Sequence, residues 1–327
     1  MDHVLSVLFL GQPVWMWLVF IAAVAGLLAF DLGVLHRGSR TIGARESLGL
    51  SAFYIVLGLA FGGFVWARIG PQAGIEYLTG FVVEKSLAMD NVFVIAMIFG
   101  YFAIPREYHH RVLFWGILGV IVLRAVMIGL GATLVAEFGW ILYLFAVFLI
   151  FTGIKMLFWD GDGEKDLSAN PLLAFVRRRF PVADRLHGNR FFVRRTDAAT
   201  GRRSLLITPL FLALILIEVA DVIFAVDSVP AIFAITTDPY VVYTSNIFAI
   251  LGLRALYFAL SAVLHRFAYL KQALAVLLVF IGSKIFVADF MGWHKFPTEA
   301  SLGVTFAILG AGILYSLWRT RAQPQEP

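Results

Sequence analysis

Long apolar runs alternate with short polar connections along almost the whole chain. A hydrocarbon core about 30 Å thick is crossed by roughly 20 apolar residues in a helix. The chain holds nine such runs, which we predict to be membrane-spanning helices: 13–35, 47–67, 75–103, 111–134, 138–159, 204–236, 243–264, 272–290 and 299–318. The pattern therefore predicts an all-α polytopic membrane protein with one long polar segment, at 160–203.

Composition agrees with this fold class and removes several kinds of function. Of the 327 residues, 61% are hydrophobic and 14% are charged, whereas soluble domains are about 45–50% apolar and about 25% charged. The chain has no Cys, which excludes disulfides, thiolate metal ligands, a Cys nucleophile and thiol redox chemistry. The net charge of +5 is weak support for nucleic-acid binding, because membrane proteins gain basic residues in their cytoplasmic loops. We therefore expect a lipid bilayer as the surroundings and no nucleic-acid partner.

The basic residues lie mostly on one side of the predicted bundle. Nineteen of the 26 Lys and Arg residues fall in one alternating set of connections, ten of them in 160–203, and only Arg68 and Lys295 fall in the other set. Cytoplasmic loops carry the excess of positive charge in membrane proteins. The N-terminus is therefore predicted outside the cell and the C-terminus in the cytoplasm.

Two groups of three spans share the order and spacing of their charged residues. An Asp, an Arg and a Lys are 34 and 31 residues apart in the first group and 33 and 30 in the second: Asp90, Arg124 and Lys155, then Asp221, Arg254 and Lys284. An odd number of spans per group makes the groups run in opposite directions, and such inverted repeats are typical of transporters. We predict five segments: peripheral helices at 1–72, repeats at 73–159 and 204–290, a cytoplasmic loop at 160–203, and a ninth helix with a tail at 291–327.

Several charged residues lie inside the predicted spans. A charged side chain at the bilayer centre costs at least about 2.5–3.5 kcal/mol, and intramembrane acids usually mark ion pathways. With the amide of Asn91, five acids near the middle of the third and sixth spans form the predicted metal site: Glu84, Asp90, Glu218, Asp221 and Asp227. Four basic residues are predicted to pair with acids and to offset charge when a cation leaves: Arg124, Arg254, Lys155 and Lys284. Asp31, near the end of the first span, is expected to reach water.

The sixth span cannot aim all its acids at one point if its helix is straight. At about 100° per residue, Glu218 and Asp221 share a face, whereas Asp227 lies about 180° from Glu218. Pro230 cannot donate to the carbonyl four residues earlier, which favours a break at 226–230. Either the helix breaks there and frees a carbonyl for a cation, or the acids serve more than one site.

The predicted site offers oxygen ligands only: carboxylates, the Asn91 amide, the hydroxyls of Ser86 and Ser228, and a backbone carbonyl. The seven His residues fall in loops, at span ends or in the tail. Oxygen-only sites suit Mn²⁺, Mg²⁺ or Ca²⁺, whereas Zn²⁺ and Cu⁺ prefer Cys and His. Carboxylates can also carry protons, so proton coupling is chemically available.

Four stretches resemble the TerC family of integral membrane proteins, and within it the Alx-like branch. They are EKSLAMDNVF at 84–93, FVR at 192–194, EVADVIFAVDSVPAIFAIT at 218–236 and TSNIFAILGLRALYF at 244–258. The resemblance implies export of Mn²⁺ across the bacterial inner membrane, with no organic cofactor, and relatives linked to tellurite resistance and alkaline response. It also implies kinship with inverted three-helix exporters of the LysE type, whose Glu-x-Gly-Asp motif is approximated by Glu218 to Asp221, with Ala220 in place of Gly.

Three functions remain open from the sequence. The leading one is an Mn²⁺ exporter that works by alternating access at a midplane carboxylate site. The second is a membrane scaffold or stress-resistance factor that acts through the loop at 160–203. The third is an oxyanion exporter that uses Arg124 and Arg254, which the excess of acids at the midplane disfavours. No enzyme motif is found, so we expect no catalytic activity.

Overall fold

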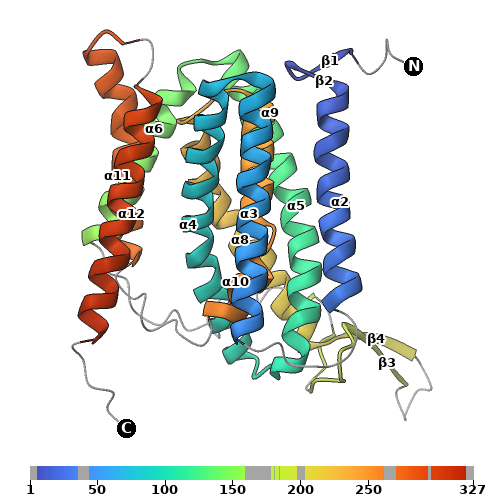
Figure 1. Cartoon of the computed structure of the whole chain (residues 1–327). Helices are drawn as coiled ribbons and strands as arrows, with labels where there is room; N and C mark the ends of the chain where they lie inside the picture. The colour runs from blue at the N-terminus through green and yellow to red at the C-terminus, as the bar shows by residue number, and fades with distance from the viewer. Residues whose placement is uncertain are drawn as a thin grey trace.

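The computed structural model describes residues 6–35, 44–158, 178–179, 181–183, 185–196, 203–260, 270–293 and 296–321. Its helices are α2 (Val14–Leu35), α3 (Ala44–Ile69), α4 (Pro71–Tyr101), α5 (Arg106–Glu137), α6 (Ile141–Phe158), α8 (Pro209–Phe233), α9 (Pro239–Ile250), α10 (Leu253–Leu260), α11 (Leu270–Phe290) and α12 (Thr298–Arg321). Figure 1 shows them as one bundle of roughly parallel and antiparallel helices. The prediction of an all-α polytopic membrane protein is confirmed.

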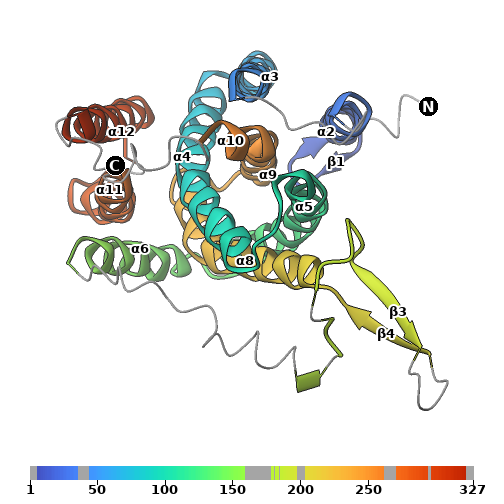
Figure 2. The same cartoon turned by 90° about the horizontal axis from the view of Figure 1, so that it is seen from below.

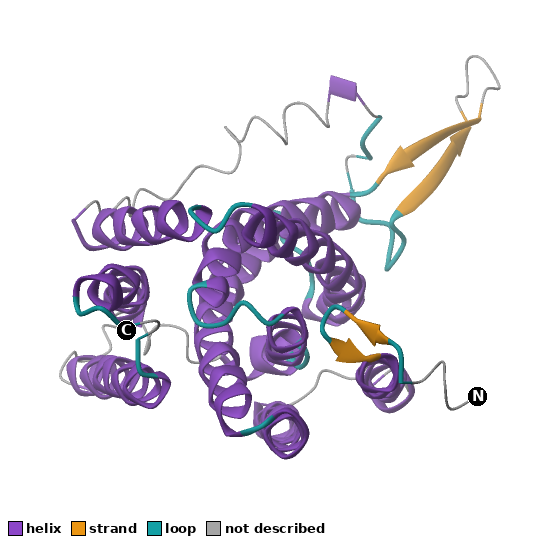
Figure 3. Ribbon diagram, turned by 90° about the horizontal axis from the view of Figure 1, so that it is seen from above, coloured by secondary structure: helices purple, strands orange, loops and turns teal. Residues whose placement is uncertain are grey.

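Two short antiparallel hairpins complete the described part of the chain. Strands β1 (Leu8–Phe9) and β2 (Gln12–Pro13) form one, and β3 (Phe192–Thr196) and β4 (Arg203–Ile207) form the other. They lie at opposite ends of the bundle (Figure 1), and β3–β4 projects outward from it (Figure 3). Because β4 occupies 203–207, the predicted start of a span at 204 is wrong, and the helix begins at Pro209. Most of the predicted loop at 160–203 lies outside the described residues.

Eight helices in the described part of the chain are long and apolar enough to cross a membrane, with α9 and α10 counted as one span. The predicted third span, at 75–103, corresponds to α4, which is not among the eight. Its 31 residues would extend for roughly 46 Å, which is enough for a crossing. Every 18-residue stretch of α4 nevertheless holds at least three of its charged residues Glu76, Glu84, Lys85 and Asp90.

The charged helix α4 is sheltered by its position in the bundle. Viewed along the bundle in Figure 2, α4, α5, α8, α9 and α10 form a central group, with α2 and α3 along one edge and α6, α11 and α12 along another. Helix α4 contacts α3, α8 and α9, and α5 contacts α8. Residues Tyr77 and Val92 of α4 have no exposed surface. The cost of charge in α4 is therefore met by protein neighbours rather than by lipid.

Helices α6 and α11 approach closely at two glycines that occupy equivalent positions in the predicted repeats. A Cβ atom on Gly153 would lie 2.6 Å from the carbonyl oxygen of Ala275, and one on Gly282 would lie 2.6 Å from that of Ala146. The contact is therefore reciprocal, as it is between elements related by a two-fold axis. The inverted repeat itself stays a prediction.

The predicted break at 226–230 is wrong, because α8 continues through Pro230 to Phe233. Pro230 lies in the last turn of α8, where it removes a single hydrogen bond, and the helix tolerates that loss. The interruption instead falls between α9 and α10, inside the predicted seventh span. Gly252 there has a φ of 83°, a left-handed conformation that glycine adopts at little cost.

Candidate functional site

Three charged side chains meet in the interior of the bundle. Arg124 of α5 bridges Glu84 of α4 and Asp221 of α8, and their side chains are 1%, 2% and 5% exposed. Its Nη1 donates to Oε1 of Glu84. Its Nη2 and Nε donate to Oδ1 and Oδ2 of Asp221 at 2.9 Å and 3.2 Å. The guanidinium therefore binds Asp221 through two parallel bonds, a geometry that gives strong and directional pairing.

Neutral polar side chains complete the hydrogen bonding around these charges. Asn246 of α9 donates to Oε2 of Glu84 at 3.0 Å, and Asn91 of α4 donates to Oδ1 of Asp221 at 3.3 Å. Ser228 of α8 accepts from Nη1 of Arg124 at 3.0 Å. All three are buried, at 0%, 6% and 2% exposure in that order. We call the six residues Glu84, Asn91, Arg124, Asp221, Ser228 and Asn246 the central cluster.

Among the described residues, two buried oxygen atoms have no hydrogen-bond partner here: Oδ1 of Asn91, within the central cluster, and Oε2 of Glu218, beside it. Glu218 lies one helical turn before Asp221, on the face that the sequence predicts they share. Its carboxylate rests against Gly119 of α5, where a Cβ would collide with it. Gly119 thus leaves room for an acid whose oxygen is available to a further ligand.

The central cluster brings together Glu84, Asn91, Asp221 and Ser228 from the predicted site, with Arg124 as their counter-ion. The backbone positions of Asp90 and Asp227 are in α4 and α8, but their side chains are not described. Within the described residues, no group of three or more carboxylate or His side chains is arranged to hold a metal ion. In this arrangement a guanidinium lies between the two acids, in the position where a bound cation would offset their charge.

The second intramembrane arginine is in a separate pair. Arg254 of α10 donates through Nη2 to Oδ1 of Asp31 in α2, and the hydroxyl of Tyr54 donates to the same oxygen at 3.2 Å. The expectation that Asp31 reaches water is wrong, because the residue is 7% exposed and ion-paired. The predicted peripheral helix α2 thus supplies the acid that balances Arg254.

The other predicted supporting residues lie apart from the central cluster. Lys284 of α11 is buried and donates to Oγ of Ser301 at 3.2 Å, whereas Lys155 of α6 is exposed. His109 was expected at a span end but is buried in α5, where its ring nitrogens contact the carbonyl of Ile104 and the hydroxyl of Tyr257. None of these contacts involves the central cluster.

Sequence reasoning missed Asn246 and the role of Lys85. Asn246 follows Thr244 and Ser245 in α9, and this polar run inside an apolar span was the available signal. Lys85 follows Glu84, yet its Nζ donates to the carbonyls of Ala249 and Leu251 at 2.9 Å and 3.3 Å. These carbonyls lose their helical partners at the interruption before Gly252, so Lys85 caps the end of α9.

Eight described helices that are apolar enough to span a membrane, around buried and paired charges, define a polytopic membrane protein. Residues 69–324 match the integral membrane protein TerC family, and the chain belongs to this family. It is 46% identical over 314 residues to "Uncharacterized membrane protein STKORF319" of Myxococcus xanthus, a match that covers 96% of this chain and 95% of the relative. It is 45% identical over 318 residues to "Putative membrane-bound redox modulator Alx" of Escherichia coli K12, covering 94% and 95%.

A membrane protein of Rickettsia bellii is similar to the same degree, with 45% identity over 303 residues, 93% of this chain and 97% of the relative. No solved structure matches the chain. The names of these relatives place the family in the membrane and assign no catalytic reaction.

Proposed function

We propose that this protein exports Mn²⁺ from the bacterial cytoplasm by alternating access, with the central cluster as its cation site. The observation that carries the proposal is the pair of buried acids, Glu84 and Asp221, bridged by Arg124 inside the helical bundle. An arrangement of buried charges is costly, and intramembrane ionisable groups are typical of ion pathways.

The arginine suggests how the cation is released. With Arg124 between the acids, one of their two negative charges is offset and the guanidinium occupies the position of a divalent cation, so the described arrangement corresponds to the empty carrier. When the guanidinium withdraws, the two carboxylates gain a hard cation as counter-ion. The further oxygen ligands are Asn91 Oδ1 and Glu218 Oε2, which have no hydrogen-bond partner among the described residues. Exchange between Arg124 and the metal would keep a positive charge between the two acids in both states.

The choice of metal follows from the ligand atoms and from the family. Carboxylate and amide oxygens suit Mn²⁺, Mg²⁺ and Ca²⁺ alike. The resemblance of 84–93 and 218–236 to TerC proteins favours Mn²⁺ among these ions. The name of the Alx relatives refers to redox modulation. Because this chain has no Cys, metal export would account for such an effect better than thiol exchange.

Alternating access is supported by the reciprocal contact of α6 and α11 through Gly153 and Gly282. Helices related by a two-fold axis can exchange roles as one half rocks against the other, which is the usual working of inverted repeats. The interruption at Gly252 adds a joint next to Asn246, a member of the central cluster. The charge pattern of the loops supports an orientation with the N-terminus outside and the C-terminus in the cytoplasm.

An oxyanion exporter fits the central cluster less well. Arg124 has its guanidinium bound to two carboxylates, which leaves no net positive charge for an anion. A scaffold that works through the loop at 160–203 is distinguished by deletion of 165–195. The deletion would abolish a scaffold's activity and leave Mn²⁺ binding by the helical bundle intact.

Mn²⁺ entry into proteoliposomes that contain a Mn²⁺-quenched dye tests the proposal. Glu218→Gln is the sharpest variant, because the oxygen it alters has no hydrogen-bond partner and no ion pair is broken. We expect this variant to lose at least tenfold in transport rate. Glu76→Gln, in α4 two turns before Glu84, is the matched control and should transport at the wild-type rate. Absence of Mn²⁺ flux with the wild-type protein, or normal flux with Glu218→Gln, would contradict the proposal.

A further inference from the structure

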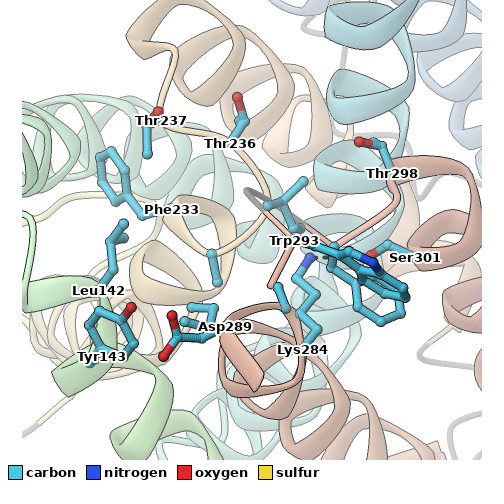
Figure 4. Close-up of a pocket in the computed structure, with 15 residues that line it drawn as sticks. Leu142, Tyr143, Phe233, Thr236, Thr237, Lys284, Asp289, Trp293, Thr298 and Ser301 are labelled. Atoms are coloured by element: carbon cyan, nitrogen blue, oxygen red, sulfur yellow. Dashed lines mark hydrogen bonds between the residues drawn. The ribbon is translucent and has the colours of Figure 1, made fainter. Parts of the chain in front are cut away.

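A second site lies at the end of the bundle where α8 gives way to α9. A cavity of about 310 Å³ is lined there by α6, the α8–α9 connection, α11 and the start of α12. No member of the central cluster lines it. Figure 4 shows its polar side chains directed into the space from different elements. Its volume is at the small end for ligand sites, which fits a compact polar group.

One corner of the cavity is suited to an anion. Lys284 and Ser301, 5% and 3% exposed, line it and are hydrogen-bonded to each other at 3.2 Å. Thr298, the first residue of α12, lies beside them. The first turn of a helix presents free backbone N–H groups and the positive end of its dipole. A buried ammonium, hydroxyl groups and a helix N-terminus thus converge.

The opposite corner is suited to a cation. Asp289 lines the cavity next to Tyr143 and apart from Lys284 (Figure 4). The last residues of α8 and the hydroxyls of Thr236 and Thr237 also line it. The carbonyl end of a helix carries partial negative charge and favours a cation. The two corners together favour a ligand with an anionic and a cationic group a few bonds apart.

Aromatic residues around the cavity indicate its depth in the membrane. Trp140, Tyr143 and Trp293 are 62%, 42% and 42% exposed, although all lie on or next to helices that are apolar enough to span a bilayer. Exposed Trp and Tyr residues gather at the level of the lipid headgroups. Trp293 and Tyr143 also line the cavity, so it lies at headgroup depth.

We propose that this cavity binds the headgroup of an aminophospholipid. The phosphate is held by Lys284, Ser301 and the first turn of α12. The primary ammonium is held by Asp289 and the carbonyl end of α8. A lipid bound here joins α6 to α11 and α12 at one end of the bundle, and it makes the stability of this end depend on the lipid present.

Native mass spectrometry of the purified full chain, titrated with defined lipids, tests this site. We expect phosphatidylethanolamine to bind at least tenfold tighter than phosphatidylcholine, whose quaternary amine cannot donate hydrogen bonds to Asp289. Lys284→Met should weaken phosphatidylethanolamine binding by about tenfold or more, because a charged hydrogen bond to the phosphate is lost. Asp289→Asn, a change at an exposed residue that does not endanger folding, should abolish the preference between the two lipids.

Lys155→Met is the matched control, because Lys155 occupies the equivalent repeat position but is exposed and does not line the cavity. It should bind phosphatidylethanolamine as the wild type does. Equal binding of the two lipids by the wild type, or equal losses from Lys284→Met and Lys155→Met, would overturn the proposal. So would equal affinity for soluble glycerophosphoethanolamine, which would identify a free zwitterion as the occupant. These lipid readouts do not depend on whether Mn²⁺ is transported.

Discussion

Removing the one cation of the central cluster should cost more stability than neutralising all three of its charges. Arg124→Met leaves Glu84 and Asp221 buried without a counter-ion, and it removes the guanidinium that donates two hydrogen bonds to Asp221, at 2.9 Å and 3.2 Å. Breaking a buried ion pair by removing one partner costs about 3–5 kcal/mol, because the remaining charge stays buried without compensation. We expect a loss of this size in the free energy of unfolding.

The combined variant Glu84→Gln/Arg124→Met/Asp221→Asn removes all three charges and leaves no ion unpaired. Replacing a buried ion network with neutral groups of similar volume is often neutral or stabilising. We therefore expect this variant to be more stable than Arg124→Met alone, by about 2 kcal/mol or more. Such a reversal would not arise if each side chain contributed independently.

Denaturant unfolding in detergent micelles, followed by the fluorescence of the eight Trp residues, measures both free energies. Glu137→Gln, a change at an exposed carboxylate on the same helix as Arg124, is the control and should stay within about 0.5 kcal/mol of wild type. A loss below about 1 kcal/mol for Arg124→Met would refute the reasoning. A triple variant less stable than the single one would refute it equally.

Three further predictions concern the helix contacts. Alanine at Gly153 or Gly282 should each lower the free energy of unfolding by about 1–3 kcal/mol through overpacking, whereas Gly303→Ala, where nothing lies within 4 Å of the new Cβ, should not destabilise the protein. Gly252→Ala should lower the free energy of unfolding by about 1–3 kcal/mol, because the φ of 83° at this position strains any residue that has a side chain. An unchanged unfolding midpoint would count against this. Lys85→Met should speed amide hydrogen exchange at the start of α10 by at least tenfold, since two carbonyls lose their charged donor, and unaltered exchange would show that the cap is dispensable.

The sequence predicts the helices and part of the central cluster well. Apolar length locates the spans, and the cost of buried charge predicts that Glu84 and Asp221 need a basic partner such as Arg124. Both inferences succeed because the length of a span and the cost of a buried charge are set by the lipid bilayer, and not by details of side-chain packing. The shared face of Glu218 and Asp221 follows in the same way from helix geometry alone.

Ion pairs between residues far apart in the chain could not be predicted from the sequence. Arg254 binds Asp31, which lies 223 residues away on a helix outside the predicted repeats, and no local pattern indicates that α2 and α10 meet. The break at Gly252 was also missed, because Pro230 is the stronger local signal for an interruption. Pro230 does not interrupt α8, because it lies in the last turn of that helix. The break at Gly252 is instead stabilised by Lys85 of α4, which donates to two carbonyls just before it.

The central claim is that Glu84 and Asp221 hold Mn²⁺ when Arg124 withdraws. Electron paramagnetic resonance of a Mn²⁺ titration measures it most directly, because the signal of free aqueous Mn²⁺ falls as the protein binds the ion. The account predicts saturable loss of the signal with the wild type and Glu137→Gln. It predicts none with folded Glu84→Gln/Arg124→Met/Asp221→Asn. Equal Mn²⁺ binding by the triple variant and the wild type would contradict the account.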